Sequence, residues 1–134
     1  MFNRKSRLGN IGEDVAIKFF RKKGYKILER NFRTKKGEID LIAERDGQLV
    51  FVEVKTRSSE NFGEPVQFVN VAKQKRILAA ALFYLTKNKL WHKKVRFDII
   101  GITKKGDNID IKHEKNAFTL EHTLDSGNTY WQPW

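Results

Sequence analysis

The chain has no cysteine among its 134 residues. Disulfides, a catalytic thiol and thiolate zinc sites are therefore excluded, and the absence fits the reducing cytoplasm, where we expect the protein. No stretch approaches the roughly 20 apolar residues needed to span a membrane. The basic start, residues 1–7, is not followed by an apolar segment, so we expect neither a signal peptide nor a membrane partner.

The sequence also lacks the motifs of several enzyme classes. A glycine-rich phosphate loop and a dinucleotide-binding glycine fingerprint are both absent. No serine has an adjacent His–acid pair, which argues against a serine hydrolase. The three histidines, His92, His113 and His122, lack metal-ligand spacing, so we interpret them as isolated surface side chains.

Positive charge, by contrast, is abundant. The chain carries 27 Lys and Arg against 16 Asp and Glu, a net charge of +11. The excess is concentrated in residues 1–36, and its sign reverses after residue 106. A small soluble domain commonly has a net charge of magnitude ~2–8, and a larger excess is typical of proteins that bind polyanions. We favour nucleic acid over an anionic membrane, because no basic amphipathic helix has an aromatic-rich apolar face.

Length and a hydrophobic content of 40% fit one domain over residues 1–134, with its core at about 8–112 and a tail at 113–134. Hydrophobic spacing predicts helices over 8–23 and 70–85. It predicts strands over 25–32, on both sides of residues 46–47, and over 95–103 and 108–112, with a loop at 61–65. The aromatic segment 130–134 could pack on its own domain, on a second copy or on a base.

Two of the predicted strands carry charged residues where a buried strand should be apolar. Glu53 and Lys55 lie two positions apart in the run 50–57, so their side chains share one face of the strand. Asp40 repeats the anomaly in the run 37–42. A sheet does not bury ionised groups without partners, because their desolvation is costly. Two acids and a lysine on one face therefore predict a metal site.

The turn between these strands decides whether the two acids meet. Asp-Gly is a preferred two-residue hairpin loop. With Asp46 and Gly47 as the loop, Asp40 faces Glu53, and Lys55 lies one pleat further along. Opposed like charges destabilise a sheet, so we expect a divalent cation to compensate them. A three-residue loop would shift the register by one and separate these residues.

The first predicted helix has a second stripe beside its apolar one, formed by Gly9, Gly12, Glu13, Ala16 and Phe20. Glycine costs about 1 kcal/mol relative to alanine inside a helix, so two of them suggest a close approach to another backbone or to a phosphate. Glu13 is then either a third acidic ligand directed toward the sheet or a solvated side chain near the helix start, where the dipole favours anions.

The second predicted helix begins with several cations. Cations at a helix N-terminus oppose the dipole, but they suit phosphate binding, since the free N–H groups there also attract phosphate. Lys73 is the best single candidate for this role. Lys75 and Arg76 can equally be read as a solvated helix face.

The pattern of Asp40 followed by Glu53-x-Lys55 on the next strand resembles the PD-(D/E)XK, or restriction-endonuclease-like, superfamily. More narrowly, residues 8–103 resemble the YraN-like family of small bacterial proteins, which are usually described as candidate endonucleases. The matching stretches are Gly9-x-x-Gly12-Glu13-x-x-Ala16, Gly24-Tyr25, Asn31-Phe32-Arg33, Gly37-Glu38-Ile39-Asp40-Leu41-Ile42, Phe51-Val52-Glu53-Val54-Lys55-Thr56-Arg57, Phe62-Gly63, Lys73 and Arg96-Phe97-Asp98.

The resemblance implies an α/β fold with a central mixed sheet flanked by helices, in the order α-β-β-β-α-β-β. It implies a metal-dependent endonuclease that hydrolyses phosphodiester bonds of nucleic acid, with DNA favoured. Catalysis would fall to Asp40, Glu53 and Lys55. One or two Mg²⁺ or Mn²⁺ ions would be held by Asp40, Glu53, the Val54 carbonyl and Glu13. The phosphate backbone would contact basic residues, among them Lys73, Arg57, Arg33, Lys35 and Lys36.

A non-catalytic nucleic-acid-binding module on a nuclease fold is the alternative, and a structural partner in a larger assembly is a third reading. The intact Asp40, Glu53 and Lys55 favour the nuclease, because a module without catalysis has no need of costly opposed carboxylates. A homodimer would suit symmetric cutting of two strands, but nothing in the sequence requires one.

Overall fold

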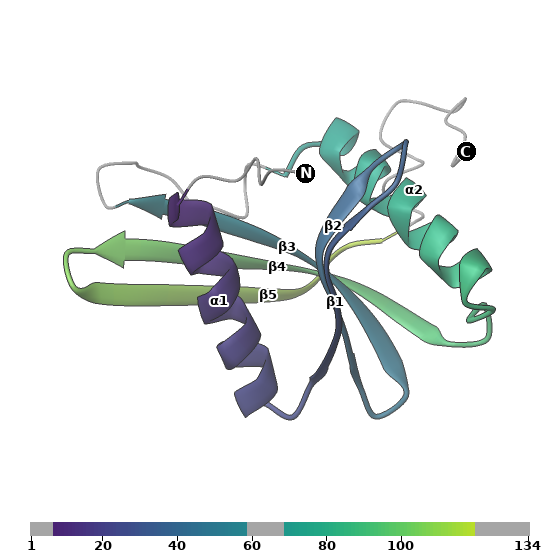
Figure 1. Ribbon diagram of the computed structural model, residues 1–134, viewed down its shortest axis with the longest axis horizontal. Helices are drawn as coiled ribbons and strands as arrows, with labels where there is room; N and C mark the ends of the chain where they lie inside the picture. The colour runs from purple at the N-terminus through teal and green to yellow at the C-terminus, as the bar shows by residue number, and fades with distance from the viewer. Residues whose placement is uncertain (1–6, 59–68, 120–134) are drawn as a thin grey trace.

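The computed structural model describes residues 7–58 and 69–119. Its elements follow the predicted order of one helix, three strands, a second helix and two strands, which confirms the α/β class (Figure 1). The predicted loop at 61–65 and the aromatic segment at 130–134 lie outside the described residues. The elements are α1 (Arg7–Lys22), β1 (Lys26–Arg33), β2 (Glu38–Arg45), β3 (Gln48–Ser58), α2 (Val71–Lys87), β4 (Lys94–Lys105) and β5 (Asn108–Phe118).

The five strands form one mixed sheet in the order β1-β2-β3-β4-β5. Neighbouring strands are antiparallel except for β3 and β4, which run parallel and are joined through α2. A parallel pair needs such a crossover, because a short turn can only return the chain in the antiparallel direction. This arrangement is compatible with the restriction-endonuclease-like fold. Within the described ranges, no helix is long and apolar enough to cross a membrane.

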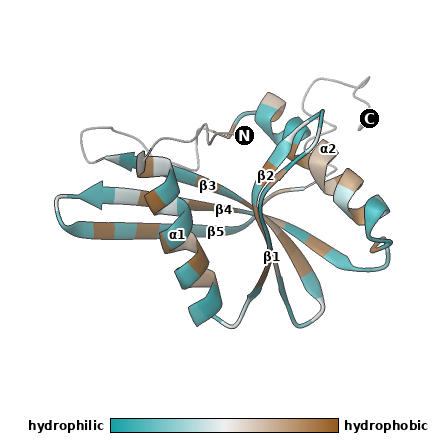
Figure 2. Ribbon diagram, viewed as in Figure 1, coloured by the Kyte–Doolittle hydropathy of each residue, from teal (hydrophilic) through white to brown (hydrophobic). Residues whose placement is uncertain are grey.

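Each face of the sheet has an apolar core of its own. On one face Phe20 of α1 packs in a cluster with Val52 of β3, and on the other Ile77 of α2 packs in a cluster with Phe51. Figure 2 shows hydrophobic residues on both helices and along the strands between them. Because successive side chains of β3 point to opposite faces and both faces are covered, residues 49–52 of this strand form a continuous apolar run.

The hairpin between β2 and β3 has the predicted two-residue loop. Asp46 and Gly47 have positive φ angles of 53° and 78°, which is the conformation of the favoured hairpin turn. The pairing runs from Arg45–Gln48 to Leu41–Val52, as the two-residue loop requires. Beyond Val52, the described part of β3 pairs with β4 alone. The β1–β2 hairpin therefore splays away from β3 next to Asp40 and Glu53 (Figure 1).

Strand β5 is longer than predicted, since it continues past residue 112 to Phe118. The reason is a long-range contact: Phe118 is buried, and its ring stacks on Phe97 of β4 with the centroids 5.1 Å apart. Residues 112–116 are all polar and show no apolar–polar alternation, so their pattern does not predict a strand.

Helix α1 lies very close to β3 where Gly12 passes Thr56. A Cβ atom at position 12 would collide with the Thr56 side chain. The close approach predicted from the helix glycines is therefore an approach to a side chain of β3 within the fold. This contact places α1 against the part of β3 that pairs with β4 alone.

Candidate active site

Asp40 and Glu53 lie together at the point where β2 and β3 separate. Each side chain is only 4% exposed. Asp40 Oδ2 accepts a hydrogen bond of 2.8 Å from the backbone N–H of Val54. Burial, followed by the charge of Asp40, raises the pKa of Glu53 to about 7, although Lys73 and Lys55 act to lower it. Near neutral pH, Glu53 therefore needs either a proton or additional positive charge.

Two lysines approach the same oxygen of Glu53 from different elements. Lys55 on β3 places Nζ 4.0 Å from Glu53 Oε2, and Lys73 on α2 places Nζ 3.4 Å from it. The side chain of Asn70 caps α2 by accepting a 2.8 Å hydrogen bond from the backbone N–H of Lys73, which fixes the first turn. Both lysine side chains are partly exposed, so a phosphate group arriving from solvent can reach them.

Glu13 is buried, which agrees with a side chain directed toward the sheet and not with a solvated one. Its Oε1 atom accepts hydrogen bonds from Arg30 Nε at 3.2 Å and Asn31 Nδ2 at 3.1 Å, both on β1. Across residues 7–58 and 69–119, no group of three or more His, Asp and Glu side chains is placed to hold a metal ion. The role of Glu13 as a third ligand stays a prediction.

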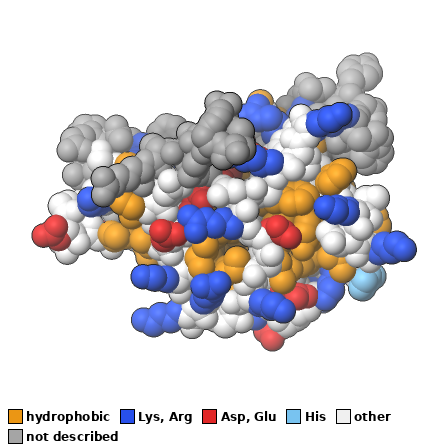
Figure 3. Space-filling model, in the orientation of Figure 1, with side chains coloured by type: hydrophobic (Ala, Val, Ile, Leu, Met, Phe, Trp, Pro, Cys, Tyr) orange, Lys and Arg blue, Asp and Glu red, His pale blue; other side chains and the backbone are white. Residues whose placement is uncertain are grey.

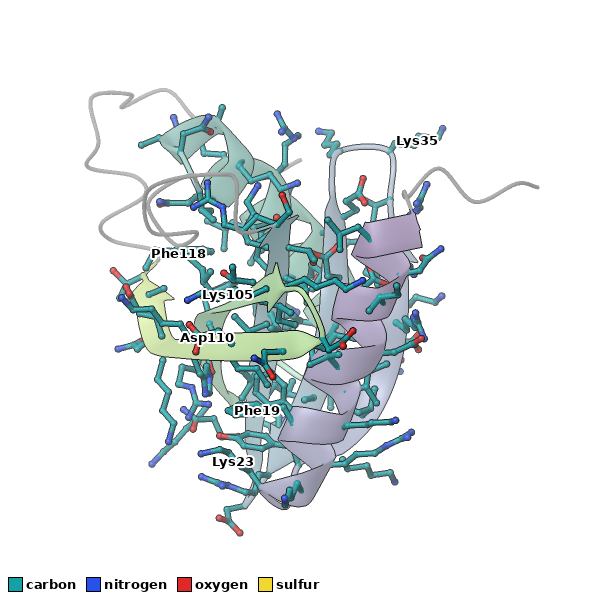
Figure 4. The ribbon with its side chains drawn as sticks, turned by 90° about the vertical axis from the view of Figure 1, so that its left-hand side faces the viewer. Phe19, Lys23, Lys35, Lys105, Asp110 and Phe118 are labelled. Atoms are coloured by element: carbon teal, nitrogen blue, oxygen red, sulfur yellow. The ribbon has the colours of Figure 1, made fainter. Side chains whose placement is uncertain are left out.

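Three of the expected phosphate-binding cations belong to the turn between β1 and β2. Arg33 ends β1, and Lys35 and Lys36 follow it, with Lys35 projecting from the tip of the hairpin (Figure 4). Thr34 holds this turn, since its Oγ1 atom accepts hydrogen bonds from the backbone N–H groups of Lys36 and Gly37. The cations are thus presented by a turn with internal hydrogen bonds.

The remaining basic candidates differ in exposure. Arg57 lies on the part of β3 that pairs with β4 alone and is partly buried. Arg76 is exposed, in agreement with a solvated helix face, but Lys75 is buried. The solvated interpretation of Lys75 is therefore wrong. A lysine allows this because its methylene stem can be covered by apolar groups.

A second buried charged cluster was missed by the sequence reasoning. Asp98 on β4 is fully buried and binds Arg96 through both carboxylate oxygens at 2.8 Å. Its Oδ2 atom also lies 2.7 Å from His113 Nε2, and the backbone N–H of Asn116 donates to Oδ1 at 3.0 Å. Burial alone would raise the pKa of Asp98, but the hydrogen bonds from His113, Arg96 and Asn116 hold it below its ordinary value.

His113 is consequently not the isolated surface residue we expected. Its side chain is 7% exposed, and the rings of Phe19 and Phe20 on α1 pack edge-on against it. The pairing of position 113 with Ile100 across β4 and β5 buries it, and that pairing depends on a long-range register. A signal was present in Arg96-x-Asp98, which repeats the same-face charge pattern of Glu53-x-Lys55. His92 is exposed as expected, and His122 lies outside the described residues.

The profile of "Uncharacterised protein family UPF0102" matches residues 12–102, more than half of the chain. The chain belongs to this family. Curated UPF0102 relatives include one from Persephonella marina, 46% identical over 114 residues, 85% of this chain and 95% of the relative. One from Geobacter metallireducens is 47% identical over 116 residues, with 86% and 94% covered. One from Lawsonia intracellularis is 41% identical over 127 residues, with 95% and 96% covered.

UPF0102 membership confirms the resemblance to the YraN-like family. The matched range contains Asp40, Glu53, Lys55 and Lys73, so the candidate active site lies inside the UPF0102 region of the chain. The family description assigns no activity. The function of this UPF0102 protein must therefore be argued from the chemistry of the site.

Proposed function

We propose that this UPF0102 protein is a Mg²⁺- or Mn²⁺-dependent endonuclease that hydrolyses phosphodiester bonds of nucleic acid, with DNA as the favoured substrate. The observation that carries the proposal is the pair of buried carboxylates, Asp40 and Glu53, next to two partly exposed lysines. Buried like charges are costly in a structural role alone. They are useful where a cation and a phosphate group must be held together.

The donor atoms at this site suit a hard divalent cation. Mg²⁺ is usually bound through one or two carboxylates while it keeps several waters and contacts substrate phosphates. Asp40 and Glu53 supply such a pair. The N–H and C=O groups of one strand residue point to the same edge, and the Val54 N–H binds Asp40. By this geometry the Val54 carbonyl would face the same gap and would add a neutral oxygen ligand.

The two lysines suggest how the chain would act on a phosphodiester. A bound divalent ion supplies polarisation of the scissile phosphate and a nucleophilic water at neutral pH. Lys55, whose Nζ atom lies 4.0 Å from Glu53 Oε2, would orient the attacking water or neutralise the charge that develops on the phosphate. Lys73, in the first turn of α2, would hold a phosphate at the end of the helix where the dipole favours anions.

Nuclease assays test this proposal directly. Labelled linear, branched and single-stranded DNA and RNA would be incubated with Mn²⁺ or Mg²⁺, with EDTA as the metal-free control. We expect the wild type to cut at least one of these substrates, and Glu53→Ala and Lys55→Ala to lose at least about 100-fold in rate. Glu114→Ala and Lys94→Ala are matched controls on exposed parts of β5 and β4 and should cut like the wild type.

Ion binding provides a second readout that does not depend on activity. Glu53→Gln should abolish the binding of Mn²⁺ measured by titration calorimetry, because it removes one of the two carboxylates. Unchanged Mn²⁺ affinity in this variant would exclude the site as a metal centre. Binding of nucleic acid without cutting, equal in the wild type and all variants, would instead support a non-catalytic binding module.

A further inference from the structure

An apolar groove lies beside the candidate active site, between the tip of the β1–β2 hairpin and α2. Its volume is about 880 Å³. One wall carries the cations Arg33, Lys35 and Lys36, and the other is formed by α2 with Leu82 and Phe83. Figure 3 shows hydrophobic side chains gathered between β2 and α2, with Lys and Arg side chains and an acidic side chain at their border.

The two walls are held together by backbone packing. A Cβ atom at Gly37, where the hairpin turn ends, would collide with the backbone carbonyl of Arg76 on α2. Only glycine allows the turn to approach the helix so closely. The backbone contact therefore fixes the position of the groove, and the side chains that line it are not its only support.

Phe83 is the most unusual residue of the groove, because it is a large apolar side chain that is 52% exposed. Its ring lies 6.2 Å from that of Phe32 on β1, at a tilt of 36°. Its other side is thus left available to solvent. An exposed aromatic ring next to three cations, with no acidic residue among the groove-lining residues that are described, is the combination that binds single-stranded nucleic acid.

The groove also has the right position for a substrate strand. Lys73, which contacts Glu53, lies on the same helix six residues before Ala79, which lines the groove. Six residues of helix span about 9 Å. The same six residues turn about 120° around the helix, so a strand whose phosphate contacts Lys73 would have to pass partly around α2 to reach the groove with its neighbouring nucleotides.

We propose that this groove binds an unpaired nucleic-acid strand next to the phosphate to be cut, with one base stacked on Phe83 and phosphates on Arg33, Lys35 and Lys36. In an intact duplex the faces of the bases are already stacked and cannot reach the ring. The preferred substrate is therefore nucleic acid with unpaired bases beside the scissile bond, such as a flap or a junction. The proposal rests on the nuclease function for the cutting step, but strand binding in the groove does not depend on it.

Fluorescence anisotropy tests the stacking contact in the full chain, without metal, on a labelled single strand of roughly 15 nucleotides and on its duplex. We expect Phe83→Ala to weaken single-strand binding roughly tenfold while duplex binding changes much less. Phe83→Leu should lose as much, since it keeps apolar volume without a ring, and Phe83→Tyr should bind like the wild type. Trp91→Ala is the control, because Trp91 is an equally exposed aromatic residue outside the groove.

The cations of the groove have a matched control of their own. Lys35→Ala/Lys36→Ala should weaken binding of both probes, whereas Lys22→Ala/Lys26→Ala removes the same charge near Lys23, at the opposite end of the molecule from Lys35 (Figure 4), and should change it little. Melting curves would confirm that every variant folds.

Three results would overturn the proposal: single-strand binding unchanged in Phe83→Ala, equal binding by Phe83→Leu and wild type, or equal losses on single strand and duplex. Because all these measurements are made in EDTA, they are separate from the nuclease assay. Lack of cutting with a ring-dependent single-strand affinity would reject the nuclease function and keep the groove proposal. Cutting by a protein whose single-strand affinity does not depend on the Phe83 ring would keep the nuclease function and reject the groove proposal.

Discussion

At the residue scale, Glu53 sets how stability depends on pH. Burial and Asp40 raise its pKa from 4.5 to about 7 in the folded chain. The folded state then holds a proton that the unfolded state releases more easily. The stabilisation that the protonated Glu53 side chain adds to the free energy of unfolding is therefore fully present below pH 4.5, and it is lost as the pH rises through about 7.

Replacing Glu53 with a residue that cannot ionise should remove this pH dependence of the stability. We expect Glu53→Gln, in the absence of divalent ions, to be more stable than the wild type at pH 8 by about 1–3 kcal/mol, and the difference to shrink toward pH 5. Urea unfolding at both pH values measures it. Glu114→Gln, exposed on β5, should show no such trend. A stability difference that is the same at pH 5 and pH 8 would contradict this explanation.

At the scale of elements, Asp98 and Arg96 connect three parts of the fold. Besides Asp98, Arg96 donates hydrogen bonds to the Tyr25 hydroxyl before β1 at 2.7 Å and to Gln48 Oε1 at the start of β3 at 3.3 Å. Asp98 itself joins β4 to β5 through His113. The cluster fixes β4 against its neighbours, and β4 is the parallel partner of the whole length of β3.

Loss of the Asp98 carboxylate should therefore strongly destabilise the folded protein. Asp98→Asn leaves Arg96, whose side chain is 13% exposed, without its counter-charge, and breaking a buried pair on one side costs about 3–5 kcal/mol. Thermal and urea unfolding above pH 6 would measure the loss, since the contribution of Asp98 is present above its ordinary pKa and falls only in acid. Asp110→Asn, exposed on β5, should stay within about 0.5 kcal/mol of the wild type. Equal stabilities of the two variants would show that the cluster has no structural role.

At the scale of the whole molecule, the net charge of +11 should govern nucleic-acid affinity. Each phosphate that a Lys or Arg neutralises releases counterions, so the logarithm of the affinity for duplex DNA falls with log salt by about 0.9 per contact. The five expected phosphate contacts lie on the hairpin turn, on β3 and at the start of α2. One of them, Lys73, contacts Glu53 of the candidate active site.

We predict that Arg57→Ala reduces this salt slope by about 1, because it removes one phosphate contact. Anisotropy titrations with duplex DNA over a range of salt concentrations measure the slope. Lys26→Ala, at the far end of the β1–β2 hairpin from Lys36, is the charge-matched control and should leave the slope unchanged. Equal slopes for all three proteins would remove Arg57 from the binding surface.

Much of the fold could be predicted because its signals are local. Alternating and helical apolar spacing depends only on neighbouring residues, so the elements and their order follow from it. The Asp46-Gly47 turn fixed the register of the hairpin, and with it the meeting of Asp40 and Glu53. The charged residues of the site could also be predicted from local sequence, because they interrupt otherwise apolar strand segments.

The sequence by itself thus determined the α/β class, the order of the elements and the pairing that brings the two acids together. Only the tertiary structure decided the partners of Glu13 on β1, the burial of His113 beneath α1 and the groove between the hairpin tip and Phe83. Each of these joins residues far apart in the chain. Their contacts depend on how the sheet splays and how the helices pack on it, which local propensity does not specify.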